Sequence, residues 1–141
     1  MLIRWLRAIA ELSVPQDVSR CGGALGRPPA EAHDRGVRVE LLVVPDCPNQ
    51  AAAGDLVRGL LDGMGLTETQ VPVRVITSEV EAARRGFTGS PTILIDGADP
   101  FAERGAIPGM ACRVYTTPGG LAGVPDSAAL QAALRAAAGL T

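Results

Sequence analysis

A strand that becomes fully apolar and then meets a proline and a cysteine constrains this chain more than any other feature. Residues 37–44 read Val-Arg-Val-Glu-Leu-Leu-Val-Val, which alternates at first and ends as an apolar run. This pattern predicts a β-strand that becomes buried on both faces. Pro45 stops the strand, and Cys47 follows two residues later. We therefore expect Cys47 to lie directly beyond the end of a buried strand.

A helix is predicted after this strand. Pro48 suits a first helical turn, and Gly63 and Gly65 end the pattern. Between them, apolar residues recur every four positions at Leu56, Leu60 and Met64, with Val57 and Leu61 beside them. Such spacing is typical of a helix that buries one face. A second strand over 71–77 follows, so this part of the chain predicts a β-α-β unit with parallel strands.

The rest of the chain completes an α/β pattern. Ser78 followed by Glu81 forms a capping box, which predicts a short helix. The remaining elements are expected in this order: that short helix over about 79–85, strands over 92–96 and 111–116, and a last helix, capped by Asp126 or Ser127, that ends near 138. The order β-α-β, short α, β-β-α predicts a four-stranded mixed sheet with helices on both faces.

Composition divides the chain near residue 36. Residues 13–36 are rich in Pro and Gly and poor in large apolar side chains, so they predict loop or disorder. Residues 1–12 have the spacing of a short amphipathic helix. We therefore expect a leader over 1–36 and one domain over 37–141. Either the leader belongs to the natural protein, or it results from a start codon assigned too early.

Charge and hydropathy exclude several classes of partner. The 141-residue chain has a formal net charge of -2, whereas phosphate binding needs an excess of basic side chains, so we expect no nucleic-acid partner. No stretch reaches the roughly 20 apolar residues of a membrane span, so we expect no membrane association. The N-terminus also lacks the unbroken apolar run of a secretory signal.

The three cysteines point to a reducing compartment. Cys21, Cys47 and Cys112 are too far apart in the sequence for the paired spacing of a zinc site, and an odd number does not make a disulfide framework. We therefore expect a cytoplasmic protein without a metal site or cofactor, in which cysteines are core residues or reactive thiols. His33 stands alone in the leader and is interpreted as an exposed loop residue.

Cys47 is the first candidate for chemistry because of its place between a strand and a helix. Backbone N–H groups point outward at a helix start, and the helix dipole adds about half a positive charge there. Both favour the thiolate, which is the nucleophile and the metal ligand. The neighbouring Asp46 opposes this effect. The alternative is that Cys47 is only a small buried turn residue.

A second motif lies before the third predicted strand, where the chain reads Gly89-Ser-Pro-Thr92. Taken together, the two motifs resemble the thioredoxin superfamily. In that superfamily a Cys-x-x-Cys or Cys-x-x-x motif opens the first helix, and a cis-proline beside the cysteine sulfur opens the next antiparallel strand. The matching residues are 47–50 and 90–92, and the resemblance covers about 37–138. It implies a thioredoxin-like fold in which Pro48, Ser90, Pro91 and Thr92 contact the substrate.

A narrower resemblance rests on four short segments: Pro45-Asp-Cys-Pro-Asn49, Gly89-Ser-Pro-Thr-Ile-Leu-Ile-Asp-Gly97, Asp99-Pro-Phe101 and Ala111-Cys-Arg-Val-Tyr115. These are similar to small bacterial proteins named only as thioredoxin family. Relatives of those proteins are sometimes labelled alkylmercury lyase-like. The resemblance implies thiol chemistry at Cys47 with a thiol or disulfide partner, either a protein or a small thiol.

The sequence departs from the thioredoxin motif at Gln50, where a second cysteine would resolve a mixed disulfide. Resolution then needs an external thiol or a distant cysteine. Cys112 is the candidate, because the neighbouring Arg113 favours a thiolate, although a cysteine at a strand start is often only a core residue. Asp99 is interpreted as a turn residue, with proton transfer as the alternative. Cys21 lies in the leader and is the weakest candidate.

Three functions are compatible with these residues. The first is a monothiol thiol-disulfide oxidoreductase, in which Cys47 attacks and Cys112 or an external thiol resolves. The second is a redox-inactive binding module, which the missing second cysteine favours and which a shared fold would permit. The third is a protein that handles a soft metal or an organomercurial with Cys47 and Cys112, because two thiolates hold a thiophilic ion.

Overall fold

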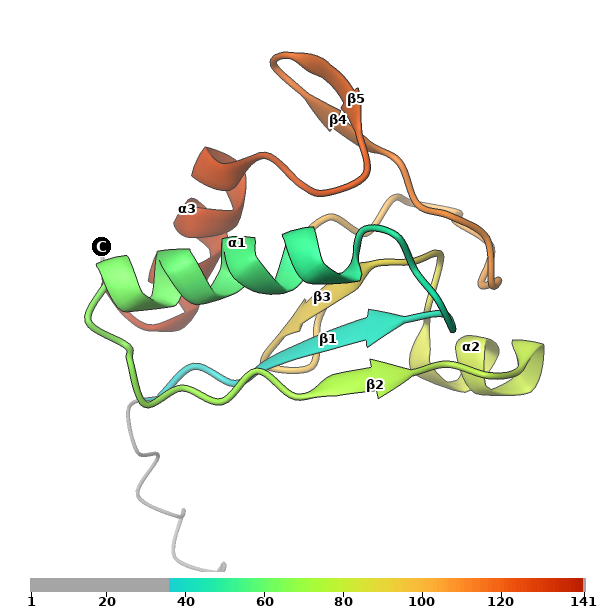
Figure 1. Ribbon diagram of the computed structural model, residues 1–141, viewed down its shortest axis with the longest axis horizontal. Coiled ribbons are helices and arrows are strands. Elements are labelled where there is room, and N and C mark those ends of the chain that lie inside the picture. Colours follow the sequence, from blue (N-terminus) through green and yellow to red (C-terminus); the bar gives the residue numbers. More distant parts are fainter. Residues whose placement is uncertain (1–35, 141) are drawn as a thin grey trace, which may run out of the picture. The chain divides into compact units, whose positions relative to one another are not determined.

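A mixed β-sheet organises the computed structural model, which describes residues 36–140. Within these residues the sheet contains β1 (Val39–Val43), β2 (Val73–Val75) and β3 (Thr92–Ile95), in the order β2-β1-β3. β2 is parallel to β1 and β3 is antiparallel to it (Figure 1). The chain is therefore an α/β protein, as predicted. Except for Gly36, the predicted leader, with Cys21 and His33, lies outside the described residues.

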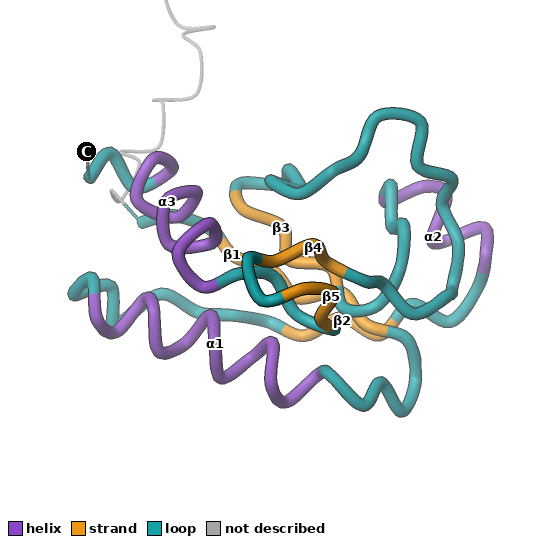
Figure 2. The backbone as a smooth tube through the Cα atoms, turned by 90° about the horizontal axis from the view of Figure 1, so that it is seen from above, coloured by secondary structure: helices purple, strands orange, loops and turns teal. Residues whose placement is uncertain are grey.

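Helices contribute to the cores on both faces of this sheet. α1 (Gln50–Gly63) and α3 (Ser127–Ala137) pack against each other and against one face, where they enclose the larger core. α2 (Glu79–Arg85) contributes Ala82 to a smaller core on the other face, which also contains Leu42, Ile76 and Phe87. Figure 2 shows α1 and α3 on one side of the molecule and α2 at the far end. Helices thus contribute side chains to the cores on both faces, but α2 lies beyond the end of the sheet and does not cover a face as predicted (Figure 1).

β1 is buried on both faces, as its apolar ending predicts. Leu41 and Val43 belong to the core under α1 and α3, whereas Leu42 belongs to the smaller core. All three side chains are fully buried. Because successive residues of a strand point to opposite faces, a continuous apolar run is what a central strand between two cores needs.

The ends of the helices follow local signals with one correction. α2 begins after Ser78, whose Oγ accepts the Glu81 N–H at 3.2 Å, and α3 begins after Asp126, whose Oδ2 accepts the Ala129 N–H at 3.0 Å. α1, however, begins at Gln50, with Asn49 as its N-cap. Pro48 therefore precedes the helix instead of lying in its first turn.

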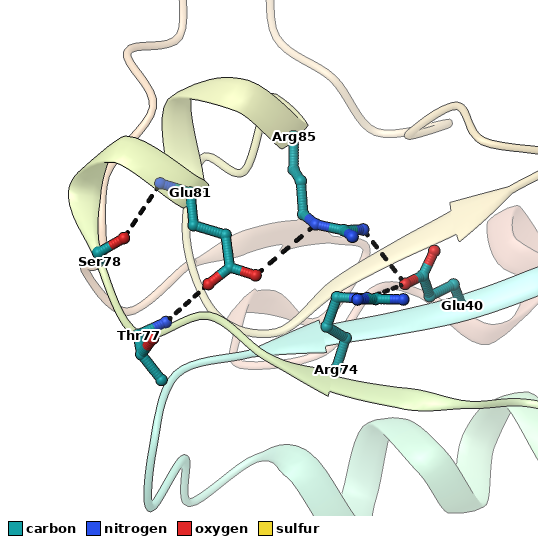
Figure 3. A network of polar contacts seen from close by, with 6 residues as sticks. All are labelled: Glu40, Arg74, Thr77, Ser78, Glu81 and Arg85. Atoms are coloured by element: carbon teal, nitrogen blue, oxygen red, sulfur yellow. Dashed lines mark hydrogen bonds and ion pairs between the residues drawn. The ribbon is translucent and has the colours of Figure 1, made fainter.

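A charged network ties α2 to the sheet (Figure 3). Glu40 on β1 accepts hydrogen bonds from Arg74 on β2 at 2.8 Å and from Arg85 on α2 at 3.4 Å. Arg85 also pairs with Glu81 at 3.8 Å within the helix. These side chains are partly exposed, so the network contributes modestly to stability and chiefly orients the helix.

The prediction that residues 111–116 form a fourth strand of this sheet is wrong. Instead, β4 (Tyr115–Thr117) and β5 (Gly120–Ala122) form a separate antiparallel hairpin. The turn Pro118-Gly119 folds the chain back at once, so β4 pairs with its nearest neighbour in the sequence. Residues 111–113 reach the sheet through an isolated parallel bridge between Ser90 and Cys112. Across residues 36–140, no helix is both long and apolar enough to cross a membrane.

Candidate functional site

The register of β1 and β3 brings the two sequence motifs to one end of the sheet. Leu42 lies opposite Thr92 in the antiparallel pairing, so continuing the register places Val44 opposite Ser90. The Val44 N–H donates a hydrogen bond to Ser90 Oγ at 3.0 Å, which extends the pairing beyond the ladder. Cys47 follows Val44 by three residues. The turn that carries Cys47 and the loop that carries Pro91 are thus joined at the end of β1.

Cys47 is a half-buried free thiol in the turn between β1 and α1. It packs against the larger core. Its carbonyl accepts the Gln50 N–H at 3.2 Å, which closes the turn at the helix start. Asp46 is exposed and has a positive φ of 56°, so the backbone reverses immediately before the cysteine.

The start of α1 is not neutralised by an acidic or capping side chain. Residues 50–53 read Gln-Ala-Ala-Ala, and in the described part of the chain no side-chain hydrogen bond comes from the N-cap Asn49. The Asn49 amide instead lies against Gly123, where a Cβ atom would overlap it. Because the first N–H groups of a helix lack intrahelical partners, the electrostatic field there favours an anion. Cys47 lies three residues before this helix start.

A buried polar network fixes the loop around Pro91. The Ser90–Pro91 peptide bond is cis. The Tyr115 hydroxyl donates to the Pro91 carbonyl at 2.6 Å, and Thr92 Oγ1 donates to the Gly89 carbonyl at 2.7 Å. Burial raises the pKa of Tyr115 to about 12, more than the nearby Arg113 charge lowers it, so the phenol remains a donor at neutral pH.

Arg113 is the centre of a second buried group of contacts. Its guanidinium donates to Asp99 Oδ2 at 2.6 Å, to the Phe101 carbonyl at 2.7 Å and to Thr92 Oγ1 at 3.1 Å. It also lies 4.6 Å from the centroid of the Tyr115 ring. Both charged side chains of the Arg113–Asp99 pair are 9% exposed. A buried ion pair is tolerated only when its polar atoms have partners, and within the described residues no buried side-chain nitrogen or oxygen lacks one.

Asp99 therefore has a structural role in this arrangement. Its Oδ1 accepts the Phe101 N–H at 2.8 Å, which forms a turn, while Oδ2 holds Arg113. The interpretation of Asp99 as a turn residue agrees with these contacts. The Arg113 side chain bonds to Asp99 and Thr92 and to the Phe101 carbonyl. Its position next to Cys112 in the sequence did not predict these contacts. Asp99 and Arg113 are 14 residues apart in segments without regular structure, so no local pattern in the sequence predicts that they pair.

The remaining predicted site residues are distributed around the same loop. Ser90, Pro91 and Thr92 are buried, whereas Pro48 is exposed in the turn of Cys47. Cys112 is an exposed free thiol whose backbone pairs with Ser90. Ser90 thus contacts both cysteine-bearing segments, through its hydroxyl on one side and its main chain on the other.

Among residues 36–140, no group of three or more His, Cys, Asp or Glu side chains is arranged to hold a metal ion. Metal handling would therefore depend on the two thiols alone in this part of the chain. Comparison with protein-family models, with curated proteins and with solved structures finds no match to this chain. The geometry of the Cys47 turn and the Pro91 loop is therefore the basis for assigning a function.

Proposed function

We propose that the domain is thioredoxin-like and that it catalyses monothiol thiol-disulfide exchange through Cys47. The observation that carries the proposal is the hydrogen bond from the Val44 N–H to Ser90 Oγ, which joins the Cys47 turn to the Pro91 loop. The mixed sheet with a core on each face and the uncapped start of α1 support it. These features combine a nucleophile, a helix start without a capping or acidic side chain among the described residues, and a rigid neighbouring loop.

The proposed reaction consists of two exchange steps. The Cys47 thiolate attacks one sulfur of a disulfide, forms a mixed disulfide and releases the other sulfur as a thiolate, which takes up a proton. A second thiol, deprotonated, then attacks the substrate sulfur of the mixed disulfide and regenerates the Cys47 thiolate. The sum is one disulfide and one thiol converted into a different disulfide and a different thiol, with no net oxidation.

The second thiol comes from outside the Cys47 turn, because Gln50 occupies the position of a resolving cysteine. An external small thiol is the simplest source. Cys112 is the alternative source within the chain, since its segment lies beside Ser90 and its side chain is exposed. In that case Cys112 attacks Cys47 Sγ, the bound substrate sulfur leaves as a thiolate, and a Cys47–Cys112 disulfide forms. Two molecules of glutathione then reduce this disulfide and leave as one oxidised glutathione. Pro48, exposed next to Cys47, is the residue best placed to contact a substrate during the first attack.

The proposal is tested by the rate of exchange between a small disulfide and excess glutathione in the presence of the full chain. We expect turnover in the wild type and in Cys112→Ser, and loss of turnover to the uncatalysed rate in Cys47→Ser. Serine keeps the size of the side chain but is a far weaker nucleophile.

Two results separate the possibilities. If Cys112→Ser loses turnover only when glutathione is scarce, Cys112 is the resolving thiol and the exchange proposal stands. Equal rates for the wild type and Cys47→Ser would contradict the proposal and favour a redox-inactive binding module.

A further inference from the structure

We infer that Cys47 exchanges with low-molecular-weight disulfides and discriminates against disulfides within polypeptide chains. This inference rests on the proposed function of Cys47 and names its substrate class. The reason is that residues 111–113, here called the strap, cover the edge of the Pro91 loop. An extended polypeptide that bound beside Ser90 through main-chain hydrogen bonds would use that edge.

The strap occupies the main-chain groups that an incoming chain would use. The Ser90 N–H donates to the Ala111 carbonyl at 2.9 Å, and the Arg113 N–H donates to the Ser90 carbonyl at 2.9 Å. Open strand edges bind extended peptides through such paired N–H and C=O groups. Because both groups of Ser90 are bonded within the chain, Ser90 has no free pair to offer an incoming polypeptide.

The strap also packs too closely for another chain to lie between it and the loop. Gly89 has a φ of 143°, and a Cβ atom there would lie 2.9 Å from Arg113 Cβ and 3.2 Å from the Ala111 carbonyl oxygen. The closest real Cβ contacts are longer than the first of these distances. Gly89 is therefore the residue that permits the strap to rest directly on the loop.

Buried side-chain contacts hold the strap in place. Arg113 is bonded to Asp99, Thr92 and the Phe101 carbonyl, and its side chain is 9% exposed. Two residues later, the Tyr115 hydroxyl holds the Pro91 carbonyl. A polypeptide that paired with Ser90 would have to displace the strap and disturb a desolvated ion pair.

A small disulfide meets none of these obstacles. Cys47 is half-buried, and its attack needs only one sulfur of the substrate to approach along the axis of the bond that breaks. The new bond joins Cys47 Sγ to that sulfur, and the electrons of the old bond leave with the other sulfur as a thiolate. The strap stays bonded to Ser90 throughout this step.

The experiment compares two probes with the same leaving group. One is the mixed disulfide of thionitrobenzoate with N-acetylcysteine amide, and the other is its mixed disulfide with the central cysteine of an extended ten-residue peptide rich in Val and Thr. Release of coloured thionitrobenzoate gives the rate, and mass spectrometry of the full chain quantifies the adduct on Cys47 separately from those on the other cysteines.

We expect the wild type to react with the small probe about tenfold faster than with the peptide, after correction for the ratio measured in the unfolded chain. Two variants release the strap in different ways. Arg113→Ala removes its anchor, and Gly89→Ala pushes a methyl group against it. In both, the ratio should fall toward that of the unfolded chain, and hydrogen exchange at the backbone N–H of position 113 should become faster.

The outcomes distinguish the two proposals. If Cys47 modification is no faster in the folded than in the unfolded chain with either probe, the proposed function fails. If Cys47 reacts fast with both probes equally, the exchange function stands and discrimination by the strap is wrong. An unchanged ratio in a variant whose strap exchanges faster would also overturn it. If Arg113→Ala fails to fold, the double variant Asp99→Asn with Arg113→Gln takes its place in this experiment. It replaces the buried charges with neutral groups.

Discussion

Ser90 connects the end of β1 to the strap through three polar groups. Its hydroxyl accepts the Val44 N–H, its N–H donates to Ala111, and its carbonyl accepts the Arg113 N–H. The residue is 1% exposed, so each of these groups needs its partner to be stable away from water. A single small side chain thus fixes the spacing between the Cys47 turn and the strap.

The burial of Tyr115 can be tested directly by spectroscopy, because it is the only tyrosine in the chain. Its hydroxyl is bonded to the Pro91 carbonyl, and burial raises its pKa from 10.0 to about 12. The folded state therefore favours the neutral phenol. We expect the phenolate absorbance to appear near pH 12 in the folded protein and near pH 10 in denaturant.

The same shift predicts how stability depends on pH. Since the pKa is raised on folding, its contribution is fully present below about pH 10 and is lost as the pH rises toward 12. Tyr115→Phe should lack both the absorbance change and this part of the alkaline loss of stability. A midpoint near 10 in a chain that is still folded would show that Tyr115 is not buried against Pro91.

Among the helices that the structure describes, α1 differs in that its first N–H groups have no capping or acidic side chain nearby in the first turn. Asn49 is held against Gly123 and makes no capping bond within the described residues. α2 and α3, by comparison, begin with capping bonds from Ser78 and Asp126. The helix that follows Cys47 is therefore the one whose N-terminal field is free to act on a thiolate.

Asn49→Asp tests this interpretation. The substitution keeps the shape of the side chain but places a carboxylate at the helix start, where it competes with the Cys47 thiolate. We expect alkylation of Cys47 by neutral iodoacetamide to slow by about two- to fivefold, which corresponds to about 0.3–1 kcal/mol. Gln131→Glu adds the same charge on an exposed position of α3 and should leave the rate unchanged. Equal rates in the two variants would argue against a role for the α1 start.

Local sequence signals predicted most elements but not the course of residues 99–117. The apolar run of β1, the Ser78 cap of α2 and the Asp96-Gly97 turn after β3 depend on adjacent residues, and all appear in the structure. The expected fourth strand depended on pairing between distant segments. There the Arg113 side chain bonds to Asp99 and the strap pairs with Ser90, contacts that periodicity cannot encode.

At the scale of the whole molecule, the candidate site is a product of topology. β1 and β3 are far apart in the sequence, yet their antiparallel register places Val44 beside Ser90. The sequence predicted the two motifs and their elements separately. It did not predict that the chain itself would occupy the neighbouring edge, because this depends on the close fit of Gly89 to Arg113. The same fold thus presents Cys47 and restricts what reaches it.

The proposed function requires that folding makes Cys47 reactive. It is tested by the rate constant for alkylation of Cys47 by iodoacetamide at neutral pH, measured by mass spectrometry in the native and the denatured full chain, with Cys112 as a reference in the same samples. We predict that Cys47 reacts about two- to fivefold faster when the protein is folded. A native rate equal to or below the denatured rate would show that folding does not activate Cys47.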